Sequence, residues 1–255
     1  MNLESLKSRI PRRKRKPGER PFCTAVIVAA GSSQRMGSDK IFTALGGLPV
    51  LVRSILAFEE NELVDEIIVV TREEKLEQVA GLVKKYGLSK VSKAILGGKT
   101  RVESCLAGVS EADHRAELIA IHDGARPLVT QTIIRETIRA ADEYYAAVPV
   151  VRSTDTLKLL DDKGVIAGSV DRETVFRVQT PQVFRADLIK GALTEAMKRG
   201  LPLTDDCSAM ELMGIRTHTV EGDEDNIKLT APRDMVVAEA ILKNRGDAYA
   251  GGTRL

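Results

Sequence analysis

The feature that most constrains the fold is a short apolar run at residues 25–29 (AVIVA) that ends in a turn of small residues. Its valine and isoleucine content is typical of a central strand buried on both faces. The turn, Ala30-Gly31-Ser32-Ser33, lets backbone come close to a ligand, and its N–H groups favour anions. Arg35 and Lys40 then supply charge for phosphates. The stretch predicts a strand and a nucleotide-phosphate loop, the alternative being an ordinary turn with incidental surface cations.

After residue 22, strand and helix patterns alternate with short connections. This order predicts a mostly parallel, Rossmann-like α/β sheet with helices on both faces. Ligands bind such sheets beyond the carboxyl ends of the strands, so the loops after residues 29, 96 and 122 are expected to converge. The expected strands are 24–29, 64–71, 90–96, 118–122 and 146–151, and the expected helices are 49–60, 73–86, 101–111 and 130–145. Gly87 is expected to close the helix 73–86, and Thr130 to act as the N-cap of the helix 130–145.

Residues 152–180 break this alternation and predict a protruding β-hairpin arm. Two short extended runs flank Asp161-Asp162-Lys163-Gly164, which is a hairpin signal. Such an arm leaves strand edges to be covered, which favours a role in dimerisation. The pattern then predicts helices at 186–199, 206–213 and 232–243 and a strand at 216–220. We therefore expect one domain, 22–246, that includes the arm, between a disordered basic tail (1–21) and a frayed C-terminus (247–255).

The net charge of +2 conceals an uneven distribution. Residues 1–20 hold eight Lys/Arg against two Glu, a local charge of +6, which leaves −4 for the rest of the chain. A mildly acidic body is not expected to bind nucleic acid. The tail is interpreted as a solvated extension, with an RNA or membrane-surface tether as the alternative.

Cysteine and histidine usage indicates the compartment. Three cysteines without CxxC spacing argue against a disulfide framework and predict a reducing, cytoplasmic setting. The three histidines are dispersed, so no zinc site is expected. No apolar run approaches the length of a membrane span, so we expect no membrane partner.

Two charged motifs suit nucleotidyl transfer. Asp123 ends the strand 118–122, where a carboxylate suits a divalent ion that bridges phosphates, although such a residue also caps turns. Arg126 follows and is placed to orient that carboxylate or to contact substrate, while His122 is interpreted as a packing residue. Asp225 and Lys228 form a second acid–base pair. Transfer of phosphoryl groups depends mainly on positioned charge of this kind.

The motifs together resemble the 2-C-methyl-D-erythritol 4-phosphate cytidylyltransferase family over about residues 22–243. The resemblance implies the nucleotidyltransferase fold and transfer of CMP from CTP to methylerythritol phosphate, with release of pyrophosphate, in the non-mevalonate route to isoprenoid precursors. It also implies Mg²⁺ and a homodimer joined through the arm. The motifs that carry it are AAGSSQRMGSDK, GGKTRVES, HDGARP, VDRETVFRVQTPQVF, TDDCSAME and EGDEDNIKLT.

The resemblance also implies roles for individual residues. Arg35, Lys40 and Lys228 would be catalytic, and Asp123 and Asp225 would lie at the metal. The acceptor would be bound by Arg126, Thr156, Arg172 and Thr180, with Thr156 and Arg172 reaching across from the partner's arm. The nucleotide would be bound by Ala29, Ala30, Gly31, Gly98, Ser104 and Asp123.

Three alternatives stay open at this point. A ribitol-5-phosphate cytidylyltransferase shares most of these motifs and the arm. A molybdenum-cofactor guanylyltransferase resembles the first loop but is not expected to carry VDR…QTPQ. A non-catalytic nucleotide-binding protein would be expected to lack some of the charged residues retained here. One departure concerns Lys40, because many family members carry Pro-Lys where this chain has Asp39-Lys40.

Overall fold

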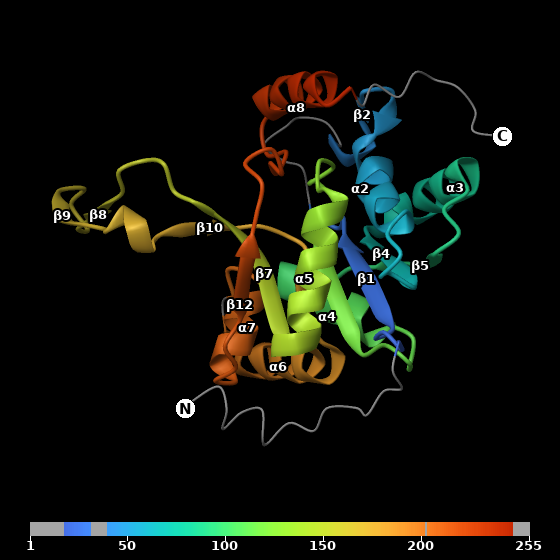
Figure 1. Cartoon of the computed structure of the whole chain (residues 1–255), viewed down its shortest axis with the longest axis horizontal. Coiled ribbons are helices and arrows are strands. Elements are labelled where there is room, and N and C mark those ends of the chain that lie inside the picture. The colour runs from blue at the N-terminus through green and yellow to red at the C-terminus, as the bar shows by residue number, and fades with distance from the viewer. Residues whose placement is uncertain (1–17, 32–39, 202, 247–255) are drawn as a thin grey trace.

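The structure is a computed structural model that describes residues 18–31, 40–201 and 203–246 (Figure 1). Within these ranges the chain forms one eight-stranded sheet flanked by helices, and an arm leaves the edge of the sheet. The strands are β1 (Cys23–Val28), β4 (Glu66–Thr71), β5 (Val91–Leu96), β6 (Leu118–Asp123), β7 (Ala146–Arg152), β10 (Phe176–Val178), β11 (Gln182–Arg185) and β12 (His218–Glu221).

The sheet is mostly parallel, as the alternating pattern predicts. Strands β5, β4, β1 and β6 pair in parallel, and β12 pairs in parallel with β7. The antiparallel strand β11 lies between β6 and β7, so β7 runs in the same direction as β6. Strand β12 occupies one edge of β7, where it opposes Ala147 and Val150. The same two residues oppose Val183 of β11 and Val178 of β10, so β10 and β11 both pair with the other edge of β7.

Strands β10 and β11 are absent from the predictions, which assigned residues 152–180 to the arm and nothing to 182–185. Both strands are very short, and Pro181 interrupts the run between them. Strand β11 is nevertheless buried at its first three residues, because it fills the space between β6 and β7. Its pairing partners, not its own periodicity, decide its conformation.

Helices cover both faces of the sheet (Figure 1). Alternate side chains of β1 enter two separate cores, Ile27 in one and Val26 in the other, which explains why the whole run is apolar. The first core contains side chains of α2 (Val50–Glu59), α3 (Leu76–Tyr86) and α5 (Gln131–Tyr144). The second contains side chains of α4 (Arg101–Ser110), α6 (Ala186–Arg199) and α7 (Asp206–Leu212).

Local signals account for the ends of several helices. The Thr130 side chain accepts the Ile133 N–H at the start of α5, as expected of an N-cap. Helix α3 ends at Gly87, whose positive φ of 61° favours glycine. The hydroxyl of Thr100 and the carboxylate of Glu103 form a capping box at the start of α4, which fixes the helix that borders the site described below.

A third, smaller core supports the segment after β12. Leu229 packs with Leu45 of the short strand β2 (Ala44–Leu45) and with Leu242 of the last helix, α8 (Pro232–Asn244). The Leu229 N–H also donates to the Ala125 carbonyl over 2.9 Å. This core holds the DNIKLT motif against the loop that follows β6.

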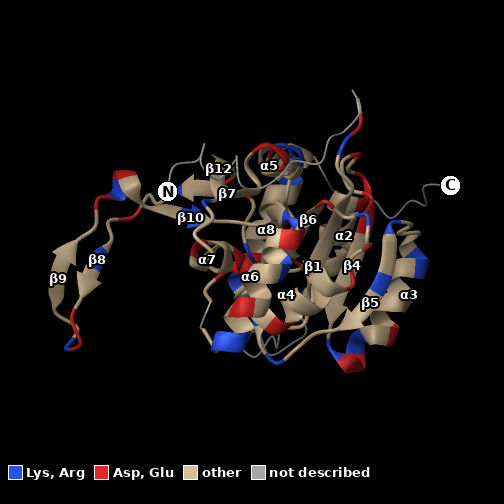
Figure 2. Cartoon of the chain, turned by 90° about the horizontal axis from the view of Figure 1, so that it is seen from below, with Lys and Arg blue, Asp and Glu red and all other residues tan. Residues whose placement is uncertain are grey.

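The predicted hairpin is present in the arm as β8 (Lys158–Leu160) and β9 (Ile166–Ser169), which pair antiparallel. Its turn contains Gly164 at φ 78° and the Asp161 carboxylate, which accepts two backbone N–H groups. Figures 1 and 2 show the arm extending away from the sheet. Leu160 and Ile166 are 61% and 62% exposed there, so the arm presents apolar surface to solvent.

Two predicted segments, the basic tail and the C-terminus, lie mostly or wholly outside the part of the chain that the structure describes. The tail residues 1–17 and the C-terminal residues 247–255 lie outside the described residues. Among the described helices none has the length and apolar character needed to cross a membrane. Figure 2 shows Lys and Arg intermixed with Asp and Glu over the helices of the body.

Candidate active site

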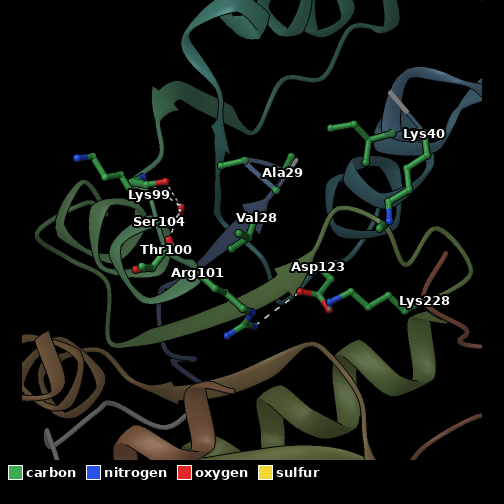
Figure 3. Close-up of a pocket in the computed structure, with 14 residues that line it drawn as sticks. Val28, Ala29, Lys40, Lys99, Thr100, Arg101, Ser104, Asp123 and Lys228 are labelled. Atoms are coloured by element: carbon green, nitrogen blue, oxygen red, sulfur yellow. Dashed lines mark hydrogen bonds and ion pairs between the residues drawn. The ribbon is translucent and has the colours of Figure 1, made fainter. Parts of the chain in front are cut away.

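A cavity of about 460 Å³ opens at the carboxyl ends of β1, β5 and β6, where the loops were expected to converge (Figure 3). Lys40, from the short helix η2 (Lys40–Phe42), and Lys228 both line it. The cavity also brings together all the residues for which the resemblance implies nucleotide binding, namely Ala29, Ala30, Gly31, Gly98, Ser104 and Asp123.

Two consecutive glycines after β5, Gly97 and Gly98, allow the loop on one side of the cavity to pack closely against its neighbours. A Cβ on Gly97 would lie 2.5 Å from the Ala30 side chain, and one on Gly98 would lie 2.1 Å from that of Glu103. The Ser104 hydroxyl accepts the Gly98 N–H over 3.1 Å and donates to the Thr100 carbonyl over 2.9 Å. The glycine loop therefore packs directly on the ends of β1 and α4.

Asp123 is the carboxylate at the floor of the cavity, and three cations surround it. Its Oδ2 lies 2.8 Å from Lys228 Nζ and 3.6 Å from Arg126 Nε, and its Oδ1 lies 3.7 Å from Arg101 Nη2. Burial alone would raise the pKa of Asp123, but Lys228, Arg101 and Arg126 outweigh it and hold that pKa well below its ordinary value. The carboxylate is therefore ionised at neutral pH.

This environment fits a divalent cation that the nucleotide helps to hold. Mg²⁺ is usually bound by one or two carboxylates together with substrate phosphates, and Asp123 offers one such carboxylate at the cavity. No cluster of three or more potential metal-ligating side chains occurs among the described residues. Asp225 does not line the cavity, and its carboxylate pairs with Arg245 Nη2 at 3.3 Å. The metal role of Asp225 thus stays a prediction.

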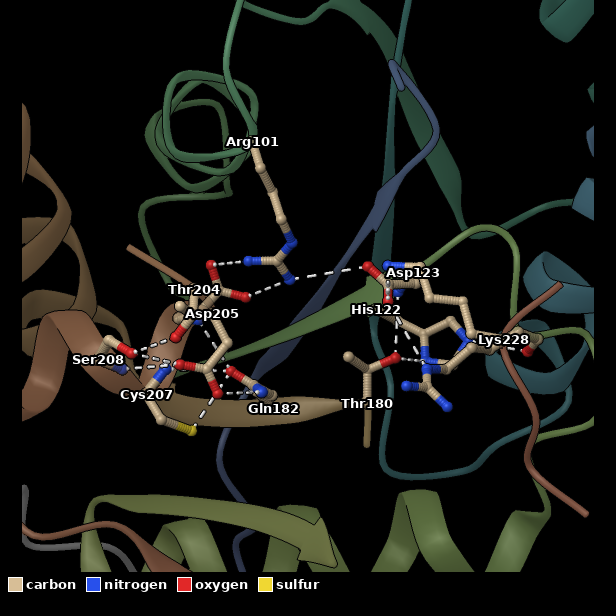
Figure 4. Close-up of polar contacts among 12 residues, drawn as sticks. Arg101, His122, Asp123, Thr180, Gln182, Thr204, Asp205, Cys207, Ser208 and Lys228 are labelled. Atoms are coloured by element: carbon tan, nitrogen blue, oxygen red, sulfur yellow. Dashed lines mark hydrogen bonds and ion pairs between the residues drawn. The ribbon is translucent and has the colours of Figure 1, made fainter. Parts of the chain in front are cut away.

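Arg101 is a cation of the site that the sequence reasoning missed (Figure 4). Its two terminal nitrogens donate to the two oxygens of Asp206 over 2.8 and 2.7 Å, and Asp206 is only 1% exposed. Burial lowers the pKa of Arg101, but the Asp206 pair outweighs it and raises that pKa above its usual value. The two residues lie in the motifs GGKTRVES and TDDCSAME, 105 residues apart, so only the fold reveals the pair.

Gln182 of β11 fixes the position of Asp206. Its Oε1 accepts the backbone N–H groups of Asp206 and Cys207, each over 3.1 Å, at the start of α7. Asp205 caps the same helix through the Ser208 N–H and accepts a hydrogen bond from Gln182 Nε2 (Figure 4). The short antiparallel strand thus holds Asp206, the partner of Arg101, and Arg101 itself lines the cavity.

We expect Asp206→Ala to lower the free energy of unfolding by about 3 kcal/mol, because it leaves the partly buried guanidinium of Arg101 without its bidentate partner. Urea denaturation measures the change. The double variant Arg101→Met/Asp206→Leu, which removes both charges, is expected to regain most of the loss. Equal stability of Asp206→Ala and the wild type would contradict this account.

His122 is buried and engages its two neighbours through both ring nitrogens. Its Nε2 lies 3.1 Å from the Arg126 carbonyl and its Nδ1 lies 3.0 Å from the Thr180 hydroxyl, which itself accepts the Asp123 N–H over 3.1 Å. The ring also packs against Phe58. The packing interpretation of His122 is confirmed. Thr180 is engaged by these groups and does not line the cavity, so its role in binding the acceptor stays a prediction.

We expect His122 to make stability depend on pH in mild acid. Burial lowers its pKa to about 4, whereas the unfolded imidazole titrates near 6.5. Because the unfolded state takes up the proton first, stability from this group is complete above pH 6.5 and falls by about 3 kcal/mol as the pH drops from 6.5 to 4. Urea unfolding of the wild type and His122→Gln across this range measures it. A stability difference that does not change with pH would contradict the assignment.

The remaining predicted site residues lie in three settings. Arg126 is mostly buried, and its Nη1 donates to the Asn226 carbonyl over 2.7 Å beside the cavity. Thr156 and Arg172 are exposed on the arm and do not line the cavity of their own protomer. Arg35 lies outside the described residues.

The mostly parallel sheet, with a glycine loop and a carboxylate among cations at its carboxyl edge, is typical of a nucleotidyltransferase. A family model described as 2-C-methyl-D-erythritol 4-phosphate cytidylyltransferase matches residues 23–244. The chain belongs to this family, as the resemblance of its motifs predicted.

Individual relatives agree with the family assignment. The chain is 45% identical over 223 residues to an enzyme of that name from Caldanaerobacter subterraneus subsp. tengcongensis, a match that covers 86% of this chain and 98% of the relative. A Clostridium novyi enzyme of the same name is 39% identical, with 86% and 96% covered.

Solved structures agree as well. The 4-diphosphocytidyl-2C-methyl-D-erythritol synthase of Anaerococcus prevotii superposes with a TM-score of 0.79 at 30% identity, covering 88% of this chain and 96% of that one. The Thermus thermophilus cytidylyltransferase superposes with a TM-score of 0.72 at 28% identity, covering 88% and 99%. These likenesses bear out the predicted fold class.

Proposed function

We propose that the protein transfers CMP from CTP to 2-C-methyl-D-erythritol 4-phosphate and releases pyrophosphate. The observation that carries the proposal is the cavity at the carboxyl edge of the sheet, where an ionised carboxylate faces three cations beside a glycine loop. Family membership supports the identity of both substrates. The reaction belongs to the non-mevalonate synthesis of isoprenoid precursors and takes place in the cytoplasm, a setting that the three buried free cysteines support.

In this proposal the chain supplies positioning and charge. The backbone at residues 29–31 and the Gly98–Ser104 wall hold the nucleotide. Asp123 would hold Mg²⁺, which neutralises charge on the triphosphate. Lys40 and Lys228 point charge into the cavity and stabilise the negative charge that develops at the α-phosphorus as the acceptor phosphate attacks in line. Arg35 is assigned the same task through the resemblance.

The partner in this proposal is a second copy of the chain, joined through the arm. The apolar side chains exposed on β8 and β9 would be buried in the interface between the two copies. Thr156 and Arg172, exposed on the same arm, would then complete the acceptor site of the other protomer, with Arg126 supplied in cis. Arg172 suits this task because a guanidinium binds phosphate through two parallel hydrogen bonds.

Phosphorus NMR of the purified protein with CTP, MgCl₂ and methylerythritol phosphate tests the proposal. The expected result is a pair of coupled diphosphate signals from the product together with free pyrophosphate, and no turnover without acceptor. Binding of CTP with no chemistry under these conditions would instead support a non-catalytic nucleotide-binding protein.

A further inference from the structure

Two buried amide side chains join the arm to the segment that carries Lys228. Gln179 follows β10 at the base of the arm and is 5% exposed, and Asn226, between β12 and α8, is fully buried. Asn226 Nδ2 lies 3.3 Å from Gln179 Oε1 and donates to the Thr180 carbonyl over 3.1 Å. The contact therefore links two segments that lie 47 residues apart in sequence.

Gln179 also binds the backbone of the same segment. Its Nε2 donates to the Asp223 carbonyl over 2.7 Å, and its Oε1 accepts the Asp223 N–H over 3.3 Å. Gln179 packs so closely against this segment that position 222 has no room for a side chain: a Cβ on Gly222 would lie 2.7 Å from Gln179 Oε1. Outside this contact, Arg177 of β10 pairs with Glu224 at the surface.

Asn226 extends the connection to the cavity. Its carbonyl accepts the Arg126 guanidinium over 2.7 Å, so the same residue touches both the arm base and the loop after β6. Lys228, two residues further on, reaches Asp123 at 2.8 Å. Lys228, which the proposed function places at the α-phosphorus, and Arg126, which it places at the acceptor, are thus both connected to Asn226.

We propose that Gln179 and Asn226 are positioning residues that fix Lys228 and Arg126 relative to the arm. This inference rests on the proposed roles of Lys228 and Arg126. The arm would bring Arg172 and Thr156 to the acceptor in the partner's site. The amide pair fixes the position of the base of that arm relative to Lys228 of its own protomer. The amide pair therefore connects the arm, which would form the dimer, to the lysine that acts in catalysis.

Neutral amides suit this joint because each provides a donor and an acceptor without a charge. Asn226→Asp keeps the size and shape of the side chain but removes the Nδ2 donor. It places a carboxylate against the Gln179 and Thr180 oxygens, which repel it, and beside Arg126, which attracts it. None of the residues that the structure describes donates a hydrogen bond to Asn226 Oδ1, so the lost Nδ2 donor is the main structural difference.

The chain offers a matched control at the opposite, amino-terminal edge of the sheet. Asn61, just before β4, is 3% exposed, and its Nδ2 donates to Gln131 Oε1 over 2.7 Å. Asn61→Asp therefore makes the same chemical change in another buried amide pair. It touches neither the cavity nor the arm.

The test compares thermal stability, CTP affinity by calorimetry, and steady-state kinetics for Asn226→Asp, Asn61→Asp and the milder Gln179→Glu, with Lys228→Met as reference. We expect the two Asn→Asp variants to lose similar stability. Of these two, Asn226→Asp alone is expected to lower kcat, by about 30- to 100-fold, because a small displacement of a catalytic group has effects of that size. Gln179→Glu keeps the acceptor for Asn226 and is expected to show a smaller loss in kcat. CTP affinity is expected to change less than threefold in all three.

Two outcomes overturn the inference. Equal kcat losses in Asn226→Asp and Asn61→Asp would assign the pair a purely structural role, as would wild-type kcat in both Asn226→Asp and Gln179→Glu while Lys228→Met is inactive. Full activity of Lys228→Met would be a separate failure, because it removes the proposed role of Lys228 on which the inference depends.

Discussion

Lys228→Met is expected to lower kcat for CMP transfer by about 1000-fold while CTP affinity changes little. The ammonium lies 2.8 Å from Asp123 at the cavity floor, and methionine keeps most of the unbranched side chain without its charge. A preorganised charge that meets negative charge developing in the transition state contributes about 3–4 kcal/mol. The loss therefore appears in kcat more than in binding. Steady-state kinetics and calorimetric CTP titration measure the two quantities.

A lysine at the surface provides the control for this experiment. Lys93 on β5 pairs with Glu111 and does not line the cavity. Its side chain is 45% exposed. Lys93→Met is expected to leave kcat within a factor of two. If Lys228→Met turned over at the same rate as Lys93→Met, the mechanism proposed here would be wrong.

Arg172→Ala is expected to raise KM for the acceptor by about 10- to 100-fold and to leave KM for CTP nearly unchanged. Arg172 lies on the arm and its side chain is 65% exposed, so it has no part in the nucleotide cavity of its own protomer. A guanidinium that binds the acceptor phosphate contributes a charge-assisted, bidentate contact, and its loss weakens that substrate alone. Initial rates at varied acceptor and at varied CTP separate the two constants.

Mixed dimers test whether Arg172 acts in the partner's site. If it does, exchange of subunits between Arg172→Ala and Lys228→Met dimers creates one intact site in each mixed dimer and restores about a quarter of wild-type activity. Arg199 is a comparable exposed arginine on α6, 61% exposed and paired with Glu195. Arg199→Ala is expected to have no effect on either KM. Equal losses of acceptor and CTP affinity in Arg172→Ala would contradict this placement.

Local patterns in the sequence were sufficient to predict the elements that carry their own signal. The apolar run of β1, the Thr130 cap of α5 and the Gly87 end of α3 all depend on neighbouring residues. The convergence of the glycine loop with Asp123 also followed, because parallel strands place their carboxyl ends at one edge. The residues themselves singled out Lys40, as a cation of the first loop, and Lys228, as part of a second charged motif, and the resemblance to a known family added their catalytic roles.

What the sequence could not predict depends on contacts between distant segments. The partners in Arg101–Asp206 and Gln179–Asn226 lie 105 and 47 residues apart, and no local rule pairs them. Strand β11 is similar, because its four residues become a strand only between β6 and β7. All four paired residues occur in motifs that carry the family resemblance, and this is the sequence signal that singles them out.

The most direct test of the central proposal is a competition between two acceptors for one enzyme. Methylerythritol phosphate and ribitol 5-phosphate are supplied together at equal concentration with CTP and Mg²⁺, and the two cytidine diphosphate products are quantified by mass spectrometry. We expect the methylerythritol product to exceed the ribitol product by at least about 100-fold, since a site built for one polyol leaves polar groups unpaired with the other. A dominant ribitol product would contradict the proposed function and identify an enzyme that activates ribitol phosphate.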